Sequence, residues 1–395
     1  MKQLFWLVAF TLMISTVTPP VSAQRPDAPK YAERGSYAVG AEEIILQEGS
    51  NDRRVLRGII WYPALPNTGG SVLEYPRRGA GIARRSAIPE ASGGPFPLII
   101  FSHGFGGHFT QASFLTEHLA THGFVVISVN HSGTAFEDLN WIGANSVLTS
   151  LADRPNDVLK SIRFAERLTA AGSGSALSGL IDTNRIGVTG HSFGGYTAFA
   201  SAGARIDFRS LDAYCESDEA LEQEPNLACS FRGSRDALAL VYNLIQPDNE
   251  PLPPISDPRI KSVVALAPFN TPAFGKHGLA ALNVPTLIMV GSADSVAKPE
   301  RDAYIAYEQT GSADKALAVL EGAEHAIFVD VCGEAVILQD GCFDPVWDKP
   351  RAHDLTNHFA TAWFLATLKA DSDARAVLKQ AQVDFIGVRY LSTIH

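Results

Sequence analysis

The segment that most constrains the fold is residues 185–195, which read RIGVTGHSFGG. A short apolar stretch leads into the five residues Gly190 to Gly194, and a helix-like run follows them as far as Ala204. A serine on a tight strand-to-helix turn needs glycine two positions before and after it, because a Cβ there would collide with neighbouring backbone. The pattern predicts that Ser192 is a nucleophile at the N-terminus of a helix, where the helix dipole favours negative charge. The alternative is a glycine-rich turn with a capping serine.

A second motif lies upstream of this turn. Residues 97–101 read PLIIF, which is typical of a strand buried on both faces, and residues 102–107 follow as SHGFGG. Acyl transfer needs two backbone N–H groups to hold the oxyanion, one after the nucleophile and one from the loop after an early strand. We expect these donors to be the amides of Phe193 and Phe105. A plain glycine-rich turn would explain the glycines but not the His-Gly-Phe-Gly order.

Two apolar runs downstream end in residues that complete a catalytic set. Residues 284–290 lead to Asp294, and residues 316–320 lead to His325. The chain order Ser192, Asp294, His325 is that of α/β-hydrolases and differs from the orders in chymotrypsin and subtilisin. We expect His325 to accept the serine proton and Asp294 to orient the imidazole. Taken separately, Asp294 could be a helix cap and His325 an ordinary loop histidine.

Three other carboxylates compete with Asp294 for the role of the acid. Glu324 adjoins the histidine and is expected to point away from it, Asp302 lies in the following helix, and Asp330 lies beyond the histidine loop. The preceding apolar strand, residues 263–270, ends without a carboxylate. This absence favours Asp294.

Strand-like and helix-like segments alternate along most of the chain. The predicted strand and helix pairs are 98–102 with 110–121, 124–129 with 156–170, 185–189 with 193–204, 261–267 with a weak helix, 285–290 with 299–309, and 316–320 with 353–369. Such alternation predicts an α/β fold with a mostly parallel central sheet of about eight strands and helices on both faces. Residues 36–47 and 55–62 are expected to form an antiparallel entry hairpin, and residues 63–97 a long loop.

The alternation is interrupted by residues 205–259, which include a possible helix at 236–245. Insertions of this length in a compact domain are usually functional or disordered. The position after the Ser192 helix favours a cap over the acyl pocket, and the alternative is a surface excursion held by a disulfide. The loop after the histidine contains three aromatic residues that are candidates for a second pocket wall or for ordinary core, namely Phe328, Phe343 and Trp347.

Residues 1–23 are predicted to be a secretory signal peptide. Lys2 precedes an apolar stretch, and residues 19–23 read PPVSA, a small-residue cleavage site. The apolar stretch is shorter than the roughly 20 residues that span a bilayer, which disfavours the alternative of a membrane anchor. We expect a periplasmic or secreted protein whose mature hydrolase domain, residues 24–395, has no membrane span.

All four cysteines, Cys215, Cys229, Cys332 and Cys342, follow this signal. An even number in an oxidising compartment predicts disulfides, with three connectivities to choose from. We favour Cys215 with Cys229 and Cys332 with Cys342, because each pair closes a short polar loop that has little core of its own. The spacings do not fit a zinc site, and neither a metal nor another cofactor is expected.

The balance of charge disfavours nucleic acid as a partner. The chain has 42 acidic and 32 basic residues, and no basic stripe with interleaved aromatic residues is present. One local basic cluster lies in the 63–97 segment and comprises Arg77, Arg78, Arg84 and Arg85. This cluster is either a solvated loop face or a contact for an anionic group on a substrate.

The combined motifs resemble the serine-dependent branch of the dienelactone-hydrolase-like α/β-hydrolases, including bacterial proteins related to plasma-type platelet-activating-factor acetylhydrolase. The matching segments are residues 37–40, 59–63, 101–106, 129–133 and 190–195. In that family the oxyanion donors occupy the positions held here by Phe105 and Phe193. The acetylhydrolases carry their acid after the strand that matches 261–267, and the dienelactone hydrolases proper use cysteine as the nucleophile, so this chain departs from both.

Residues and resemblance together predict a serine carboxylic-ester hydrolase that forms an acyl-enzyme on a small-molecule or lipid-like ester. The alternatives are a polyesterase of the cutinase type, an acetylhydrolase-type lipid esterase, an amidase, and a non-catalytic binding protein on a hydrolase scaffold.

Overall fold

One central sheet of eleven strands organises the described part of the chain. The structure is a computed structural model that describes residues 28–139, 143–222, 227–247, 249–331 and 341–395. The strands are β1 (Ala38–Leu46), β2 (Leu56–Ala64), β3 (Val72–Tyr75), β4 (Gly79–Arg85), β5 (Phe96–Ser102), β6 (Val125–Val129), β7 (Ile181–His191), β8 (Ile260–Leu266), β9 (Thr286–Gly291), β10 (Lys315–Leu320) and β11 (Val388–Ser392).

The sheet order is β11-β10-β9-β8-β7-β5-β6-β2-β1-β4-β3. The strands β6, β5, β7, β8, β9 and β10 pair in parallel. At one side β2 pairs antiparallel with β6 and β1 antiparallel with β2, as predicted for the entry hairpin, and at the other side β11 pairs antiparallel with β10. Because the parallel strands share one direction, the residues that follow β5, β7, β9 and β10 meet at the same edge of the sheet.

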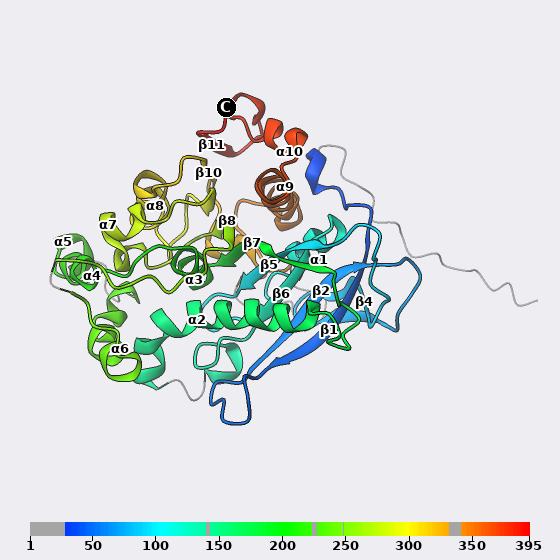
Figure 1. Cartoon of the computed structure of the whole chain (residues 1–395). Coiled ribbons are helices and arrows are strands. Elements are labelled where there is room, and N and C mark those ends of the chain that lie inside the picture. Colours follow the sequence, from blue (N-terminus) through cyan, green and yellow to red (C-terminus); the bar gives the residue numbers. More distant parts are fainter. Residues whose placement is uncertain (1–27, 140–142, 223–226, 248, 332–340) are drawn as a thin grey trace, which may run out of the picture.

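Helices cover both faces of this sheet (Figure 1). They are α1 (Ser113–Thr121), α2 (Ala144–Thr169), α3 (Phe193–Ser201), α4 (Phe208–Cys215), α5 (Asp218–Leu221), α6 (Ser234–Tyr242), α7 (Gly275–Ala280), α8 (Ala303–Gln309), α9 (Lys349–Leu368) and α10 (Ser372–Val377). Side chains of β5 alternate between two cores: Leu98 and Ile100 pack with α2 and α3, and Ile99 and Phe101 pack with α1 and α9. The predicted α/β fold is confirmed.

The predicted number of strands, about eight, is too low. Of the strands that were not predicted, β3 and β4 lie in the segment 63–97 that was expected to be a loop. The reason is a tertiary contact, since the buried Glu117 accepts the backbone N–H groups of Ile82 and Ala83 at 2.9 and 2.8 Å. Gly81 permits this approach, because a Cβ there would overlap the Glu117 carboxylate.

Helix α2 begins about three turns earlier than the predicted helix at 156–170, and Pro155 lies inside it. A proline in a helix interior cannot donate to the carbonyl four residues before it, which is Leu151. The Tyr196 hydroxyl of α3 donates to this carbonyl at 3.0 Å. A side chain from another helix thus replaces the missing backbone hydrogen bond.

The insertion at 205–259 is built from short helices, α4, α5 and α6, and α6 corresponds to the predicted helix at 236–245. Cys215 and Cys229 form a disulfide, which confirms the first predicted pair. Cys332 lies outside the described residues, as do residues 1–23 of the predicted signal peptide. None of the helices within the described ranges is long and apolar enough to span a bilayer.

Candidate active site

Ser192 lies on the turn between β7 and α3, at the edge of the sheet where the parallel strands end. Its backbone has φ 58° and ψ −119°, a left-handed conformation that residues other than glycine rarely adopt. The glycines two positions away allow the turn to pack against the end of β5. A Cβ on Gly190 would lie 2.6 Å from the Ser102 carbonyl oxygen, and a Cβ on Gly194 would overlap the same atom.

Strand β8 holds this turn in place. The Ser192 N–H donates to the carbonyl of Leu266 at 2.8 Å, and the Ser192 carbonyl accepts from the N–H of Phe269 at 3.1 Å. A strained backbone persists only where the surrounding structure fixes it, as it does here. Ser192 is not completely buried, since 8% of its surface remains accessible to solvent.

The structure brings Asp294 and His325 together after β9 and β10. The Asp294 Oδ2 lies 2.7 Å from the His325 Nδ1, while Oδ1 accepts the N–H groups of Val296 and Ala297 at 2.9 and 2.7 Å. The main chain therefore aims the carboxylate at the ring. Because an ionised carboxylate only accepts hydrogen bonds, the imidazole donates from Nδ1, which leaves Nε2 of the neutral ring as a proton acceptor.

The three competing acids have other partners. Glu324 accepts from the side chain of Ser295 at 3.2 Å. Asp302 pairs with Arg301 and accepts from the N–H of Thr271. Asp330 is buried, and its carboxyl group lies against the first turn of α1. There it accepts from the hydroxyl of Ser113 at 2.5 Å and from the N–H of Phe114 at 3.0 Å. Each carboxylate is thus used elsewhere in the fold.

His191, for which the sequence predicts no role, contacts the candidate base His325. Its Nε2 donates to the main-chain carbonyl of His325 at 3.0 Å, and the two rings lie 4.6 Å apart. Burial holds the pKa of His191 well below its ordinary value, so the ring is neutral. The sequence offers no signal for this contact beyond its place beside Ser192, because the two histidines come together only in the folded chain.

The loop after β5 carries Phe105 at the same edge of the sheet. Its neighbours are bonded: the Gly104 N–H donates to the side chain of Gln111 at 2.7 Å, and the Gly106 N–H donates to a carbonyl of the loop after β6 at 2.9 Å. Within the described ranges, the Phe105 N–H has no acceptor. The other predicted donor, Phe193, is the first residue of α3, where N–H groups have no partner inside the helix.

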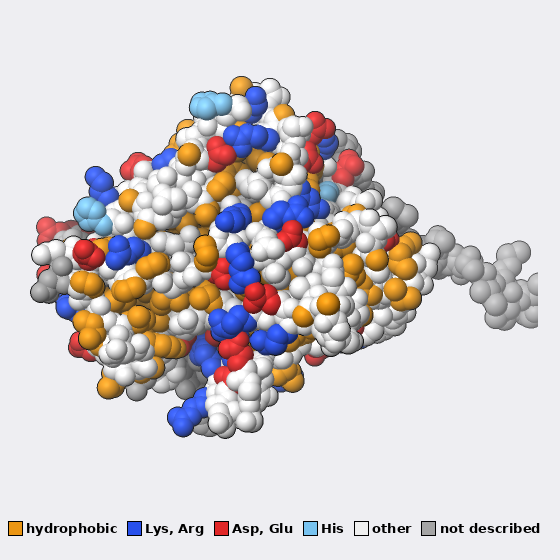
Figure 2. Space-filling view, in the orientation of Figure 1, with side chains coloured by type: hydrophobic (Ala, Val, Ile, Leu, Met, Phe, Trp, Pro, Cys, Tyr) orange, Lys and Arg blue, Asp and Glu red, His pale blue; other side chains and the backbone are white. Residues whose placement is uncertain are grey.

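A cavity of about 210 Å3 opens beside the serine. Its lining residues are Phe105, Val147, Ser192, Leu227, Ser230, Phe231, Phe269 and Val296. Three of them, Leu227, Ser230 and Phe231, belong to the insertion at 205–259, so this segment forms one wall. Hydrophobic side chains also gather on the outer surface over α4 to α6 (Figure 2). The exposed large apolar residues of that segment are Leu221, Leu227, Leu240, Val241 and Ile245.

The aromatic residues of the loop after His325 are not part of this lining. Phe328 is fully buried in the core, Trp347 packs against the same core, and Phe343 is 76% exposed. For Phe328 and Trp347 the alternative of ordinary core is therefore correct.

Two members of the basic cluster are paired with carboxylates. Arg78 lies 2.8 Å from the buried Glu117, and Arg85 lies 3.0 Å from Glu43. In the part of the chain that the structure describes, no group of three or more His, Cys, Asp or Glu side chains is placed to hold a metal ion.

Comparisons with known proteins point to hydrolases. The chain is 26% identical over 198 residues to a protein named bis(hydroxyethyl) terephthalate hydrolase from Streptomyces coelicolor, a match that covers 50% of this chain and 52% of the relative. It is 25% identical over 142 residues to cutinase est2 from Thermobifida alba, covering 36% of this chain and 37% of the relative. It is 27% identical over 166 residues to platelet-activating factor acetylhydrolase from Gallus gallus, covering 31% and 39%.

The chain thus spans between about a third and a half of the length of these relatives. A broader match comes from a family model described as "Alpha/beta hydrolase family", which matches residues 99–337. This match extends from β5, through the turn at Ser192, to the loop after β10. It takes in more than half of the chain, and the chain belongs to the alpha/beta hydrolase family.

Proposed function

We propose that this hydrolase is an exported serine esterase that cleaves carboxylic esters through an acyl-enzyme. Ser192 is the nucleophile, His325 the general base, Asp294 its orienting acid, and the amides of Phe105 and Phe193 hold the oxyanion. The observation that carries the proposal is the 2.7 Å hydrogen bond between Asp294 and His325 at the sheet edge that also bears the strained serine turn.

The proposed reaction uses these residues in turn. As the Ser192 Oγ attacks the ester carbonyl, His325 takes its proton at Nε2, and Asp294 stabilises the imidazolium that forms. The two amides hold the developing oxyanion. When the intermediate collapses, the ester C–O bond breaks, the imidazolium gives its proton to the departing oxygen, and the acyl group stays on Ser192. Water activated by the same histidine then hydrolyses the acyl-enzyme and frees the serine.

An apolar group on the ester fits the cavity beside the serine. Phe231 and Phe269 form buried walls, while Phe105 and Val296 remain 45% and 37% exposed at its margin. We assign the insertion at 205–259 as a cap over this acyl pocket. The substrate class is a small or lipid-like ester, and the candidates kept beside it are a polyester and an acetylated lipid, of the kinds named in the relatives.

Export is the second part of the proposal. It is supported by the signal-like residues 1–23 and by the disulfide between Cys215 and Cys229, since disulfides persist in oxidising compartments. Cleavage after Ala23 and recovery of the mature chain outside the cytoplasm would test it. Retention of residues 1–23 in cytoplasmic protein would contradict it.

The activity test uses the purified mature chain with p-nitrophenyl esters from acetyl to octanoyl, a matched panel of amides, and a fluorophosphonate label mapped by mass spectrometry. We expect hydrolysis of esters, slow or no hydrolysis of amides, and a label on Ser192 that the Ser192→Ala variant lacks. A folded wild-type chain that neither labels at Ser192 nor cleaves any ester would instead be a binding protein.

A further inference from the structure

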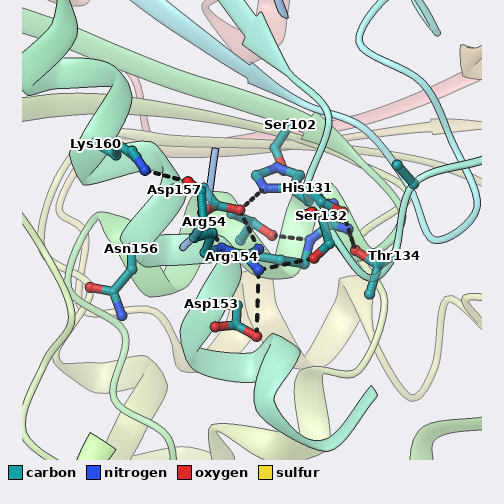
Figure 3. Close-up of polar contacts among 12 residues, drawn as sticks. Arg54, Ser102, His131, Ser132, Thr134, Asp153, Arg154, Asn156, Asp157 and Lys160 are labelled. Carbon is teal, nitrogen blue, oxygen red and sulfur yellow. Dashed lines mark hydrogen bonds and ion pairs between the residues drawn. The ribbon is translucent and has the colours of Figure 1, made fainter. Parts of the chain in front are cut away.

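A second serine, histidine and aspartate, namely Ser102, His131 and Asp157, are joined by hydrogen bonds (Figure 3). Ser102 ends β5 and precedes the loop of residues 103–107 that carries Phe105. The Ser102 Oγ lies 2.8 Å from the His131 Nε2, and the His131 Nδ1 lies 2.9 Å from the Asp157 Oδ2. All three residues are at most 1% exposed, so no substrate reaches Ser102. This set is therefore not a second catalytic centre. Its role depends on the residues to which it is hydrogen-bonded.

The protonation of this set follows from its surroundings. Burial keeps the pKa of His131 well below its ordinary value, so the ring is neutral. Its Nδ1 donates to Asp157, which also accepts from Arg54 at 2.6 and 2.7 Å, and its Nε2 accepts from the hydroxyl of Ser102. Once its proton is committed to His131, the Ser102 oxygen is available only as an acceptor.

Arg154 of α2 is the donor to that oxygen. Its fully buried guanidinium donates to the Ser102 Oγ at 3.3 Å, to the Thr134 Oγ1 at 2.8 Å, to the Thr197 Oγ1 at 3.0 Å and to the His103 carbonyl. Every acceptor of Arg154 among the described residues is thus a neutral oxygen. A buried cation without a hydrogen-bonded carboxylate is costly to the fold, so the question is which segments its hydrogen bonds hold together.

Two of these acceptors fix the loop that carries the first predicted oxyanion donor. The His103 carbonyl lies two residues before Phe105 in the chain. Thr134 accepts the N–H of Gly106, the residue after Phe105, at 2.9 Å through its own carbonyl. Arg154 therefore contacts the loop directly before the Phe105 amide, and Thr134 links it to the residue after that amide.

The other contacts fix the element that carries the second donor. Thr197, one turn along α3 from Phe193, donates to the Phe193 carbonyl at 2.9 Å and accepts from Arg154. The guanidinium carbon of Arg154 also lies 4.7 Å from the centre of the Phe193 ring. One side chain thus joins the Phe105 loop to the first turn of α3.

We propose that Arg154 is a positioning residue of the oxyanion hole, which fixes the Phe105 loop against α3 so that the two amides converge before substrate binds. The proposal rests on the proposed function of Ser192. Preorganised donors stabilise the transition state more than the bound substrate, so the contribution of Arg154 belongs in kcat and not in KM. Its positive charge, which has no hydrogen-bonded carboxylate among the described residues, also favours the negative charge of the tetrahedral intermediate.

The experiment compares the wild type with Arg154→Met and Arg154→Lys, and counts active sites by fluorophosphonate titration so that kcat refers to folded enzyme only. For Arg154→Met we expect kcat per titrated site to fall about 100-fold or more, as for the loss of one oxyanion donor, with KM within about threefold. Affinity for an alkyl boronic acid, which forms a tetrahedral adduct on the serine, should fall by the same factor. Arg154→Lys keeps the positive charge but loses the planar guanidinium with its several donors. Its kcat per titrated site should lie between those of the wild type and Arg154→Met.

Arg185→Met is a control away from the site, at an arginine that is partly exposed and pairs with Asp182 at 2.6 Å. Arg185 also donates to main-chain carbonyls, those of Leu368 and Pro95, but it does so at the opposite end of β7. The Arg185→Met substitution should lower the melting temperature and leave kcat per titrated site unchanged. If Arg154→Met does not fold, Arg154→Lys decides: kcat within twofold of wild type overturns the proposal, and a tenfold fall with unchanged KM supports it.

The failure of this inference is distinguishable from failure of the proposed function. A wild-type chain that has no titratable serine and no esterase activity removes the proposed function itself. A wild type that titrates fully beside an Arg154→Met variant that keeps its kcat and its boronic acid affinity, with only a lower melting temperature, reduces Arg154 to a structural residue.

Discussion

The Oδ2 of Asp294 lies 2.7 Å from the Nδ1 of His325, and the other carboxylate oxygen is held by two backbone N–H groups. The carboxylate therefore has no freedom to serve another partner. An arrangement of this kind fixes both the orientation of the imidazole and the nitrogen that carries its proton.

The Asp294→Asn variant tests what this contact does. An amide at this position can donate to Nδ1, which would place the ring proton on Nε2 and deprive Ser192 of its proposed base. We expect the fold to be retained and kcat to fall by roughly 10⁴, the size of effect seen when a triad aspartate is replaced by asparagine. Steady-state kinetics with circular dichroism would measure both, and Glu324→Gln is the control. Near wild-type turnover would remove Asp294 from the mechanism.

The cavity beside Ser192, which we propose as the acyl pocket, is lined by Phe231, a buried residue of the insertion. The centre of its ring lies 5.1 Å from the centre of the Phe193 ring. Truncation to Phe231→Ala lengthens the cavity, so we expect the ratio of kcat/KM for octanoyl over acetyl esters to rise about tenfold, in the range that pocket shape controls. The exposed Phe343→Ala is the control. An unchanged ratio in titrated enzyme would place the acyl group elsewhere.

The parts of the site that the sequence predicted are those with local causes. The glycines around Ser192 are required by a turn of five residues, and the positions of Asp294 and His325 follow from two apolar strands that end before them. Such features need only the direction of a parallel sheet to bring them to one edge. The order of the residues in the chain was therefore enough to place them.

The features that the sequence did not predict have partners far away in the chain. Two backbone N–H groups of strand β4 donate to the side chain of Glu117, which follows the strand by more than thirty residues. Arg154 finds its acceptors on three separate segments, after β5, after β6 and on α3. Side-chain contacts of this range leave no period or motif in the sequence, because they are decided by packing after the sheet is formed.

The hydrogen bond from Tyr196 to Leu151 predicts a measurable coupling with Pro155. Tyr196→Phe leaves the Leu151 carbonyl buried without a donor, and we expect the free energy of unfolding to fall by about 1–3 kcal/mol. In a Pro155→Ala background the backbone N–H at 155 can bond this carbonyl, so the same change should cost less. A double-mutant cycle by urea unfolding measures the difference. Equal costs in both backgrounds would mean that the tyrosine does not replace the missing bond.

The buried Asp330 predicts how stability depends on pH. Burial raises the pKa of Asp330 to about 6 from an ordinary value of 3.8. Between these values the folded chain holds a proton that the unfolded chain has lost, so the contribution of Asp330 to stability is complete below about pH 4 and falls as pH rises through 6.

Asp330→Asn removes this dependence, because its amide does not ionise. The unfolding free energy of the variant, relative to wild type, should therefore increase by about 2 kcal/mol between pH 4 and pH 6.5, since one pKa unit corresponds to about 1.4 kcal/mol and part of the change lies below pH 4. Urea unfolding at half-unit steps of pH measures it, with the exposed Asp373→Asn as control. If the difference stays constant across this range, the carboxyl of Asp330 is ionised in the folded chain and its contacts with Ser113 and Phe114 are those of a charged helix cap.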